Sequence, residues 1–142
     1  MPTSKLSAPL AVDANALLSA LIGGRARDIL LKGSGQFVTT EQSLAEVREY
    51  LPRLAAKYHL NAELLSAVLV TLPVDVRGRD SYAEQMDEAR QRIGSRDPDD
   101  VDLLALALHL KAAVWSNDRD FRDAGIELWT TAELLAELDR GR

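Results

Sequence analysis

The sequence predicts an α/β fold in which a central parallel sheet is covered by helices on both faces, as a three-layer α/β/α sandwich. Short apolar segments alternate with helical patterns along all 142 residues, and such alternation implies parallel strands joined by crossover helices. Two acids, Asp13 and Asp118, follow apolar segments closely. Ligands of an open parallel sheet bind outside the carboxyl ends of its strands, so these acids indicate a site there.

The first elements are short. Residues 10–12 are apolar and predict a buried strand, and a helix over 15–22 is stopped by two glycines. A second short helix over 26–32 is closed by the glycine-rich segment 33–35. The next strand is expected at 37–39.

A longer helix follows from Glu41, because apolar residues recur at helical spacing as far as Tyr58. Pro52 is expected to kink or divide that helix. Asn61 predicts the start of another helix over 62–71. Residues 73–76 are expected to form an edge strand, where a proline is tolerated.

The second half continues the alternation. Residues 82–93 carry many charges and predict an exposed helix, whereas 101–110 are apolar almost all round and predict a buried one. Asp97 and Pro98 suit the N-cap and first position of that buried helix. The remaining elements are expected to be a strand at 114–116, one helical turn at 121–124, a strand at 127–129 and a terminal helix at 131–139.

The composition limits the classes of protein. A chain of this length forms one domain with a proper core, so residues 1–142 are expected to be a single domain. The absence of cysteine excludes disulfides and thiolate metal sites, and the net charge of −5 argues against binding nucleic acid by bulk electrostatics. No segment resembles a signal peptide or a membrane span, so we expect a cytoplasmic protein.

The acids have ordinary explanations as well as functional ones. Asp13 suits a helix cap, and Asp118 suits an Asx-turn or the cap of a short turn. The segment 97–102 is harder to explain by capping, because it places four acids within six residues. Mutual repulsion raises carboxyl pKa values, and a bound divalent cation would relieve it. Hard cations such as Mg²⁺ or Mn²⁺ take oxygen ligands.

Four segments together resemble PIN-domain ribonucleases, and especially the VapC-type toxins of toxin–antitoxin pairs. Residues 10–21 resemble the opening strand of the family with its aspartate, and 43–47 resemble the helix that carries its glutamate. Residues 97–107 resemble the third acidic segment, and 115–121 resemble the closing serine or threonine motif. The order of the four segments in a chain of this length makes the resemblance specific. It implies a PIN-like fold.

The resemblance assigns Asp13, Glu46, Asp100 and Asp118 as catalytic residues, with the three aspartates as metal ligands. Asp100 is chosen within its cluster because small helix residues then fall in the positions of the family. The spacing of the sequence does not separate Glu46 from the neighbouring helix residues Glu41 and Glu49.

Supporting roles are also implied. Asn15 and Ser116 match polar residues that support the first and fourth acids, and Asp120 is a candidate extra acid. His59 and His109 are expected to be structural, and the second is expected inside the buried helix.

The implied activity is hydrolysis of RNA with Mg²⁺ or Mn²⁺ as cofactor, leaving 5′-phosphate and 3′-hydroxyl ends. The implied partners are the RNA substrate, an antitoxin protein that covers the acidic groove and, as a homodimer, a second copy of the chain. Three alternatives stay open: a non-toxin PIN nuclease in RNA processing, a PIN-like binding module without catalysis, and an aspartyl-phosphate phosphatase. The phosphatase class needs a second aspartate where this chain has Asn15.

Overall fold

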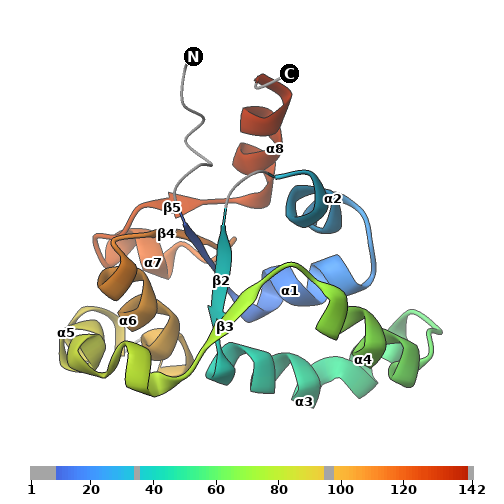
Figure 1. Ribbon diagram of the computed structural model, residues 1–142, viewed down its shortest axis with the longest axis horizontal. Helices are drawn as coiled ribbons and strands as arrows, with labels where there is room; N and C mark the ends of the chain where they lie inside the picture. The colour runs from blue at the N-terminus through green and yellow to red at the C-terminus, as the bar shows by residue number, and fades with distance from the viewer. Residues whose placement is uncertain (1–8, 34–35, 95–97, 141–142) are drawn as a thin grey trace.

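A five-stranded parallel sheet forms the centre of the computed structural model, which describes residues 9–33, 36–94 and 98–140 (Figure 1). The strand order is β3-β2-β1-β4-β5, and every neighbouring pair is parallel. The strands are short: β1 (Leu10–Val12), β2 (Phe37–Thr40), β3 (Asp75–Arg77), β4 (Ala113–Trp115) and β5 (Leu128–Trp129).

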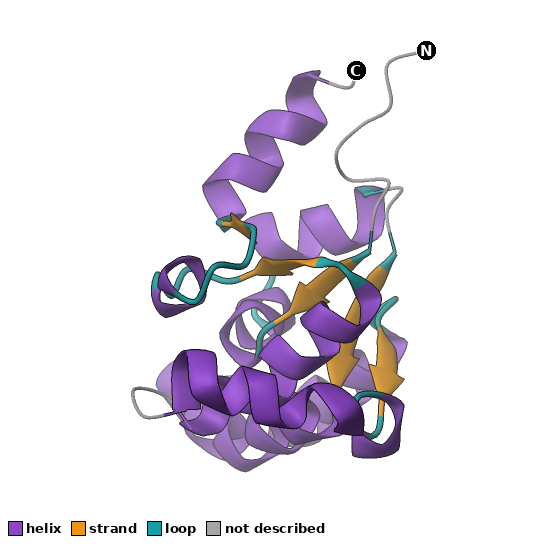
Figure 2. Cartoon of the chain, turned by 90° about the vertical axis from the view of Figure 1, so that its left-hand side faces the viewer, coloured by secondary structure: helices purple, strands orange, loops and turns teal. Residues whose placement is uncertain are grey.

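Helices connect the strands and cover both faces of the sheet, which confirms the predicted three-layer α/β/α sandwich (Figure 2). Their bounds are α1 (Ala14–Leu21), α2 (Arg25–Lys32), α3 (Glu41–Lys57), α4 (Ala62–Thr71), α5 (Met86–Ala89), α6 (Val101–Leu110), α7 (Asp120–Asp123) and α8 (Thr131–Arg140). None of the helices in the described part of the chain is both long and apolar enough to cross a bilayer.

The two faces of the sheet carry separate hydrophobic cores, because side chains alternate along each strand. Leu10 and Val12 of β1 point into a core with α1, α2, α3, α4 and α8. Ala11, between them, points into a second core with α6 and the segment around α5. In Figure 1, α5, α6 and α7 accordingly lie on the opposite side of the sheet from α1 and α2. Strands buried on both faces need continuous apolar sequence, as β1 and β4 have.

The order of the strands places β1 where the direction of winding reverses. The chain passes from β1 to β2 on one side of it and later returns to β4 on the other. The carboxyl ends of β1 and β4 therefore lie side by side, with Val12 in register with Trp115. Such a switch point opens a crevice for ligands.

Helix α6 brings its first residues to the same edge. It ends at Leu110, and after a left-handed residue, Lys111, the chain enters β4 at its amino end. The helix therefore runs antiparallel to the strands, and its beginning, next to Asp100, lies toward their carboxyl ends.

One local expectation was wrong, and one of the two alternatives for Pro52 is excluded. Pro52 lies inside the continuous helix α3 and does not divide it, and its exposed position lets water replace the lost backbone hydrogen bond. Residues 82–93 do not form one exposed helix: short helical turns bury Tyr82 and Ile93. His109 lies in α6, as expected, and its side chain is exposed near the end of that helix. Asp97, the expected cap of the buried helix, lies outside the described residues.

Candidate active site

Asp13 ends β1 and begins α1, and both of its carboxylate oxygens are engaged. One oxygen accepts a hydrogen bond from the backbone N–H of Ala16 at 2.8 Å, which makes Asp13 the N-cap of α1. The other accepts a hydrogen bond from the hydroxyl of Ser116. Only 6% of Asp13 is exposed. The expected capping role is therefore correct, but a simple cap does not require a buried second oxygen.

Ser116 connects Asp13 to Asp118. It follows β4 directly, is fully buried, and its backbone N–H donates to Trp129 in β5 at 3.1 Å. Its Oγ accepts a hydrogen bond from the backbone N–H of Asp118 at 2.9 Å while donating to Asp13. The expected supporting serine thus holds two of the predicted acids at adjacent strand ends.

Asp118 lies in a turn of its own. Its Oδ1 accepts a hydrogen bond from the N–H of Asp120 at 3.0 Å, which is the expected Asx-turn. This bond fixes the carboxylate close to the end of β4, where its side chain is half-buried. Asp120, the candidate extra acid, is also half-buried and begins α7.

The electrostatics of this pair favour a cation. Burial raises the pKa of Asp13 above its usual range, and the negative charge of Asp118 raises it further. The hydrogen bonds from Ser116 and Ala16 oppose this shift in pKa. Because the ionised form of Asp13 is disfavoured, a positive ion beside the two carboxylates would stabilise the protein.

The donor set fits a hard divalent cation. Mg²⁺ keeps several water ligands and binds proteins through one or two carboxylates together with substrate phosphates. Asp13 and Asp118 can supply those carboxylates. Among the described residues, however, no three carboxylate or histidine side chains form a metal-binding group. The set of three aspartates therefore stays a prediction, with Asp13 and Asp118 as the two members that Ser116 joins.

Asp100 and Glu46 approach the same edge from different helices. Asp100 precedes α6 as its N-cap and is half-buried. Glu46 lies in the second turn of α3, which starts immediately after β2, and its Oε1 atom is buried. Glu41 and Glu49, the alternatives to Glu46, are both exposed. Burial thus favours Glu46, which helical spacing alone did not.

The sequence interpretation missed a polar cluster at this edge, formed by Arg79, Tyr82 and Asp102. Asp102 is buried in α6, where both of its oxygens accept hydrogen bonds from Arg79 and one also accepts from Tyr82. A signal for this cluster was present in the sequence. An acid inside a continuous apolar helix pattern requires a partner, because unpaired buried charges are rare.

Comparison with known proteins places the chain in a family. A family model described as "PIN domain" matches residues 11–139. No curated protein sequence matches the chain.

Two solved structures share the fold. A toxin–antitoxin complex from Klebsiella pneumoniae matches with a TM-score of 0.63 and 23% identity, over 86% of this chain and 97% of that one. VapBC2 from Rickettsia felis, bound to a DNA fragment from the promoter, matches with a TM-score of 0.65 and 13% identity, over 86% and 98%. The family match spans nearly the whole described structure and agrees with the architecture of the sheet. We conclude that the chain belongs to the PIN-domain family.

Proposed function

We propose that this protein is a divalent-metal-dependent endoribonuclease and the toxin of a toxin–antitoxin pair. The observation that carries the proposal is the pairing of Asp13 and Asp118 through Ser116 at the switch point of the sheet. Membership of the PIN-domain family and the fold shared with toxin–antitoxin complexes support it.

In the proposed mechanism, Asp13 and Asp118 would hold Mg²⁺ or Mn²⁺, and Asp100 would contribute a third carboxylate from the start of α6. When bound, the ion supplies Lewis-acid chemistry that offsets charge on the scissile phosphate and favours ionisation of water. Ser116 keeps the Asp13 carboxylate oriented through its hydrogen bond. Glu46 would orient the attacking water and accept its proton while the bond from phosphorus to the 3′ oxygen breaks. The leaving 3′ oxygen would take a proton from solvent, so that the cleaved RNA carries 5′-phosphate and 3′-hydroxyl ends.

The test is cleavage of a mixed pool of single-stranded RNA by the full chain. We expect cleavage with Mg²⁺ or Mn²⁺ and none with EDTA. Asp13→Asn, Asp100→Asn and Asp118→Asn should each lose activity, whereas the exposed control Asp139→Asn should retain it. Cleavage that persists in EDTA or in the Asp118→Asn variant would contradict the metal-dependent mechanism.

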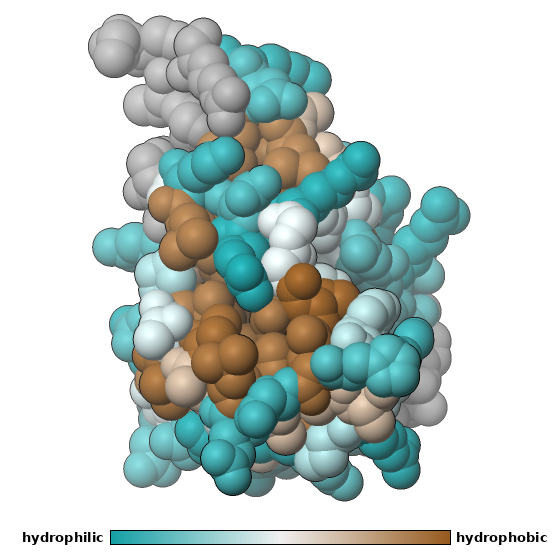
Figure 3. Space-filling model, turned by 90° about the vertical axis from the view of Figure 1, so that its right-hand side faces the viewer, coloured by the Kyte–Doolittle hydropathy of each residue, from teal (hydrophilic) through white to brown (hydrophobic). Residues whose placement is uncertain are grey.

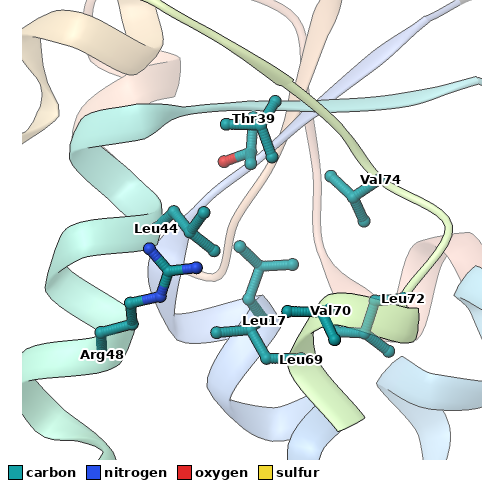
Figure 4. Close-up of a pocket in the computed structure, with 9 residues that line it drawn as sticks. Leu17, Thr39, Leu44, Arg48, Leu69, Val70, Leu72 and Val74 are labelled. Atoms are coloured by element: carbon teal, nitrogen blue, oxygen red, sulfur yellow. The ribbon is translucent and has the colours of Figure 1, made fainter. Parts of the chain in front are cut away.

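A toxin also needs a partner that covers it, and the protein has an apolar surface suited to one. A hollow of about 220 Å³ is lined by residues of helices α1, α3 and α4 and of strands β2 and β3 (Figure 4). Leu17, Leu44 and Leu69 line it, and Arg48 borders it. Val70 of α4 also lines the hollow and is 72% exposed, and Figure 3 shows a broad hydrophobic area on this side of the molecule.

We propose that the antitoxin packs an apolar segment into this hollow, so that α4 becomes buried in the complex. Expression of the chain alone in a bacterial host should arrest growth, and Asp118→Asn should grow normally. Growth that is unaffected by the wild-type chain, despite RNA cleavage in vitro, would favour a non-toxin PIN nuclease. We also propose a homodimer, which sedimentation equilibrium measures directly.

A further inference from the structure

A second polar cluster lies at the carboxyl edge of the sheet, where Asp102 follows the candidate ligand Asp100 by two residues. Arg79 follows β3 after one residue and pairs with Asp102 of α6 through two hydrogen bonds, Nε to Oδ2 and Nη2 to Oδ1, each 3.1 Å long. The hydroxyl of Tyr82 donates to Oδ2 of the same carboxylate at 2.7 Å. This geometry is the planar, two-point pairing that only an arginine can make with a carboxylate.

Asp102 acts as an anchor in this cluster. Its side chain is only 8% exposed, and both of its oxygens are engaged by Arg79 and Tyr82. Tyr82 is itself buried, and both its burial and the charge of Asp102 raise its hydroxyl pKa, so it stays a hydrogen-bond donor. Because the Asp102 carboxylate is itself held in place, it fixes the orientation of the Arg79 guanidinium.

Arg79, in contrast, faces solvent. Its side chain is 59% exposed although its partner is buried. A guanidinium group has five N–H donors, and the two hydrogen bonds to Asp102 engage only two of them. The remaining donors are held in a fixed orientation. Because the side chain is already ordered, binding an anion would lose little further conformational entropy.

The surface around Arg79 is hollowed rather than flat. A depression of about 340 Å³ is lined by Glu41, Gln42, Ala45, Arg79, Tyr82 and Asp102. Asp102 and Glu41 offset the positive charge of Arg79, so the depression attracts anions weakly at long range. What it offers is directional hydrogen bonding at short range, which suits one phosphate group of a chain already held elsewhere.

The depression lies within reach of a chain held at Asp13. Extending the registers of β1 with β2 and of β2 with β3 aligns Asp13, Thr40 and Arg77 across the edge of the sheet. Adjacent strands are about 4.8 Å apart, so the end of β3 lies roughly 10 Å from Asp13. That separation is of the order of one to two nucleotides of an extended single strand.

We propose that Arg79 binds a backbone phosphate of the RNA one or two nucleotides away from the phosphate that is cleaved, with Asp102 and Tyr82 as positioning residues. This inference rests on the proposed ribonuclease function and extends it by assigning part of the substrate path. Arg79 then contributes to RNA affinity rather than to the chemical step.

The test is binding of a short fluorescent single-stranded RNA of mixed sequence to the full chain in EDTA, followed by anisotropy at several salt concentrations. For single strands, the slope of log affinity against log salt concentration is negative, and each lost phosphate contact makes it less steep by about 0.7. We expect Arg79→Gln to make the slope less steep by about 0.7 and to weaken RNA binding about 3-fold to 10-fold at low salt. Arg79→Lys should keep the slope and still bind more weakly, because it loses the fork geometry.

Two further variants separate this role from general effects. Arg90→Gln is the matched control. Arg90 directly follows α5, its side chain is 56% exposed, and it pairs with Asp87 of α5 at 3.1 Å, so it is also an exposed arginine held by an aspartate. This substitution should leave both slope and affinity unchanged. Tyr82→Phe keeps the charge of Arg79, so it should weaken binding with the slope intact. If Arg79→Gln does not fold, as judged by circular dichroism, Arg79→Lys and Tyr82→Phe decide the question.

Wild-type slope and affinity in folded Arg79→Gln, or an equal loss in Arg90→Gln, would overturn the role of Arg79 while leaving the ribonuclease proposal intact. Wild-type RNA affinity in Arg79→Lys or in Tyr82→Phe would also overturn the role of Arg79. A wild-type chain that neither binds nor cleaves single-stranded RNA would instead overturn the proposed function.

Discussion

Replacing Ser116 with alanine should damage both the stability of the protein and its affinity for metal. The hydroxyl of Ser116 donates to the buried carboxylate of Asp13 and accepts from the backbone N–H of Asp118 at 2.9 Å. A hydrogen bond to a charged group contributes about 1.5–3 kcal/mol, and the second bond is of the ordinary neutral kind. Because Asp118 is half-buried, water can partly replace that second bond. We therefore expect the free energy of unfolding to fall by about 2–4 kcal/mol.

The loss of metal affinity follows from the same contact. Without the serine hydroxyl, the Asp13 carboxylate is no longer held toward Asp118, and loss of such a supporting contact weakens metal binding about 10-fold to 100-fold. Urea denaturation measures the stability, and calorimetric titration with Mn²⁺ measures the affinity. Ser116→Thr keeps the hydroxyl and should behave like the wild type.

Ser43→Ala provides the matched control. Ser43 is also a buried serine, but its hydroxyl accepts only from the neutral hydroxyl of Thr40, at 3.0 Å. Its replacement should cost about 0.5–1.5 kcal/mol and leave Mn²⁺ binding unchanged. If Ser116→Ala and Ser43→Ala have the same stability and the same Mn²⁺ affinity, Ser116 does not organise the site.

Three other predictions follow from the described contacts. Glu46→Gln should abolish RNA cleavage while the exposed Glu49→Gln does not, and equal activity in the two variants would refute the choice of glutamate. Glu133 accepts from the backbone N–H that precedes α8, and this bond lowers its pKa; Glu133→Ala should therefore cost about 1 kcal/mol at neutral pH. The difference should vanish as the pH falls through the lowered pKa of Glu133, because the ionised carboxylate provides the stabilisation; a loss that does not change with pH in urea denaturation would contradict it. Gly33→Ala should lower the free energy of unfolding by about 1–3 kcal/mol, since a Cβ there would lie 2.6 Å from the backbone oxygen of Ile29 and 2.9 Å from the ring of Phe37; wild-type stability in urea would contradict these close contacts.

Much of the fold followed from local sequence signals. Asn61 predicted the start of α4, and its side chain does accept from the N–H of Leu64 at 3.0 Å. Strand positions were predicted within one or two residues. For β1 and β4 the reason is that a strand buried on both faces of a parallel sheet is a short, continuous apolar segment. The prediction of one exposed helix from Tyr82 to Ile93 was wrong, because the many charged residues of this segment hid a set of buried positions that includes Met86 and Ala89. Periodicity there is also interrupted by changes in helical winding.

The candidate site was only partly predictable. Asp13 and Asp118 were found because acids at the ends of parallel strands must lie at one edge of the sheet. The role of Ser116 as a bridge depends on side-chain geometry across 103 positions of sequence, which no local pattern contains. The pairing of Asp102 with Arg79 is equally distant, spanning 23 positions. Within the acidic segment, sequence alone did not show that Asp102 is the buried acid and Asp100 the half-buried one.

Anomalous diffraction from crystals of the full chain grown with Mn²⁺ tests the central claim most directly. The account predicts a manganese peak in contact with carboxylate oxygens of both Asp13 and Asp118, and its loss in the Asp118→Asn variant. A peak at a different place, or saturating Mn²⁺ with no peak beside these two carboxylates, would contradict the account.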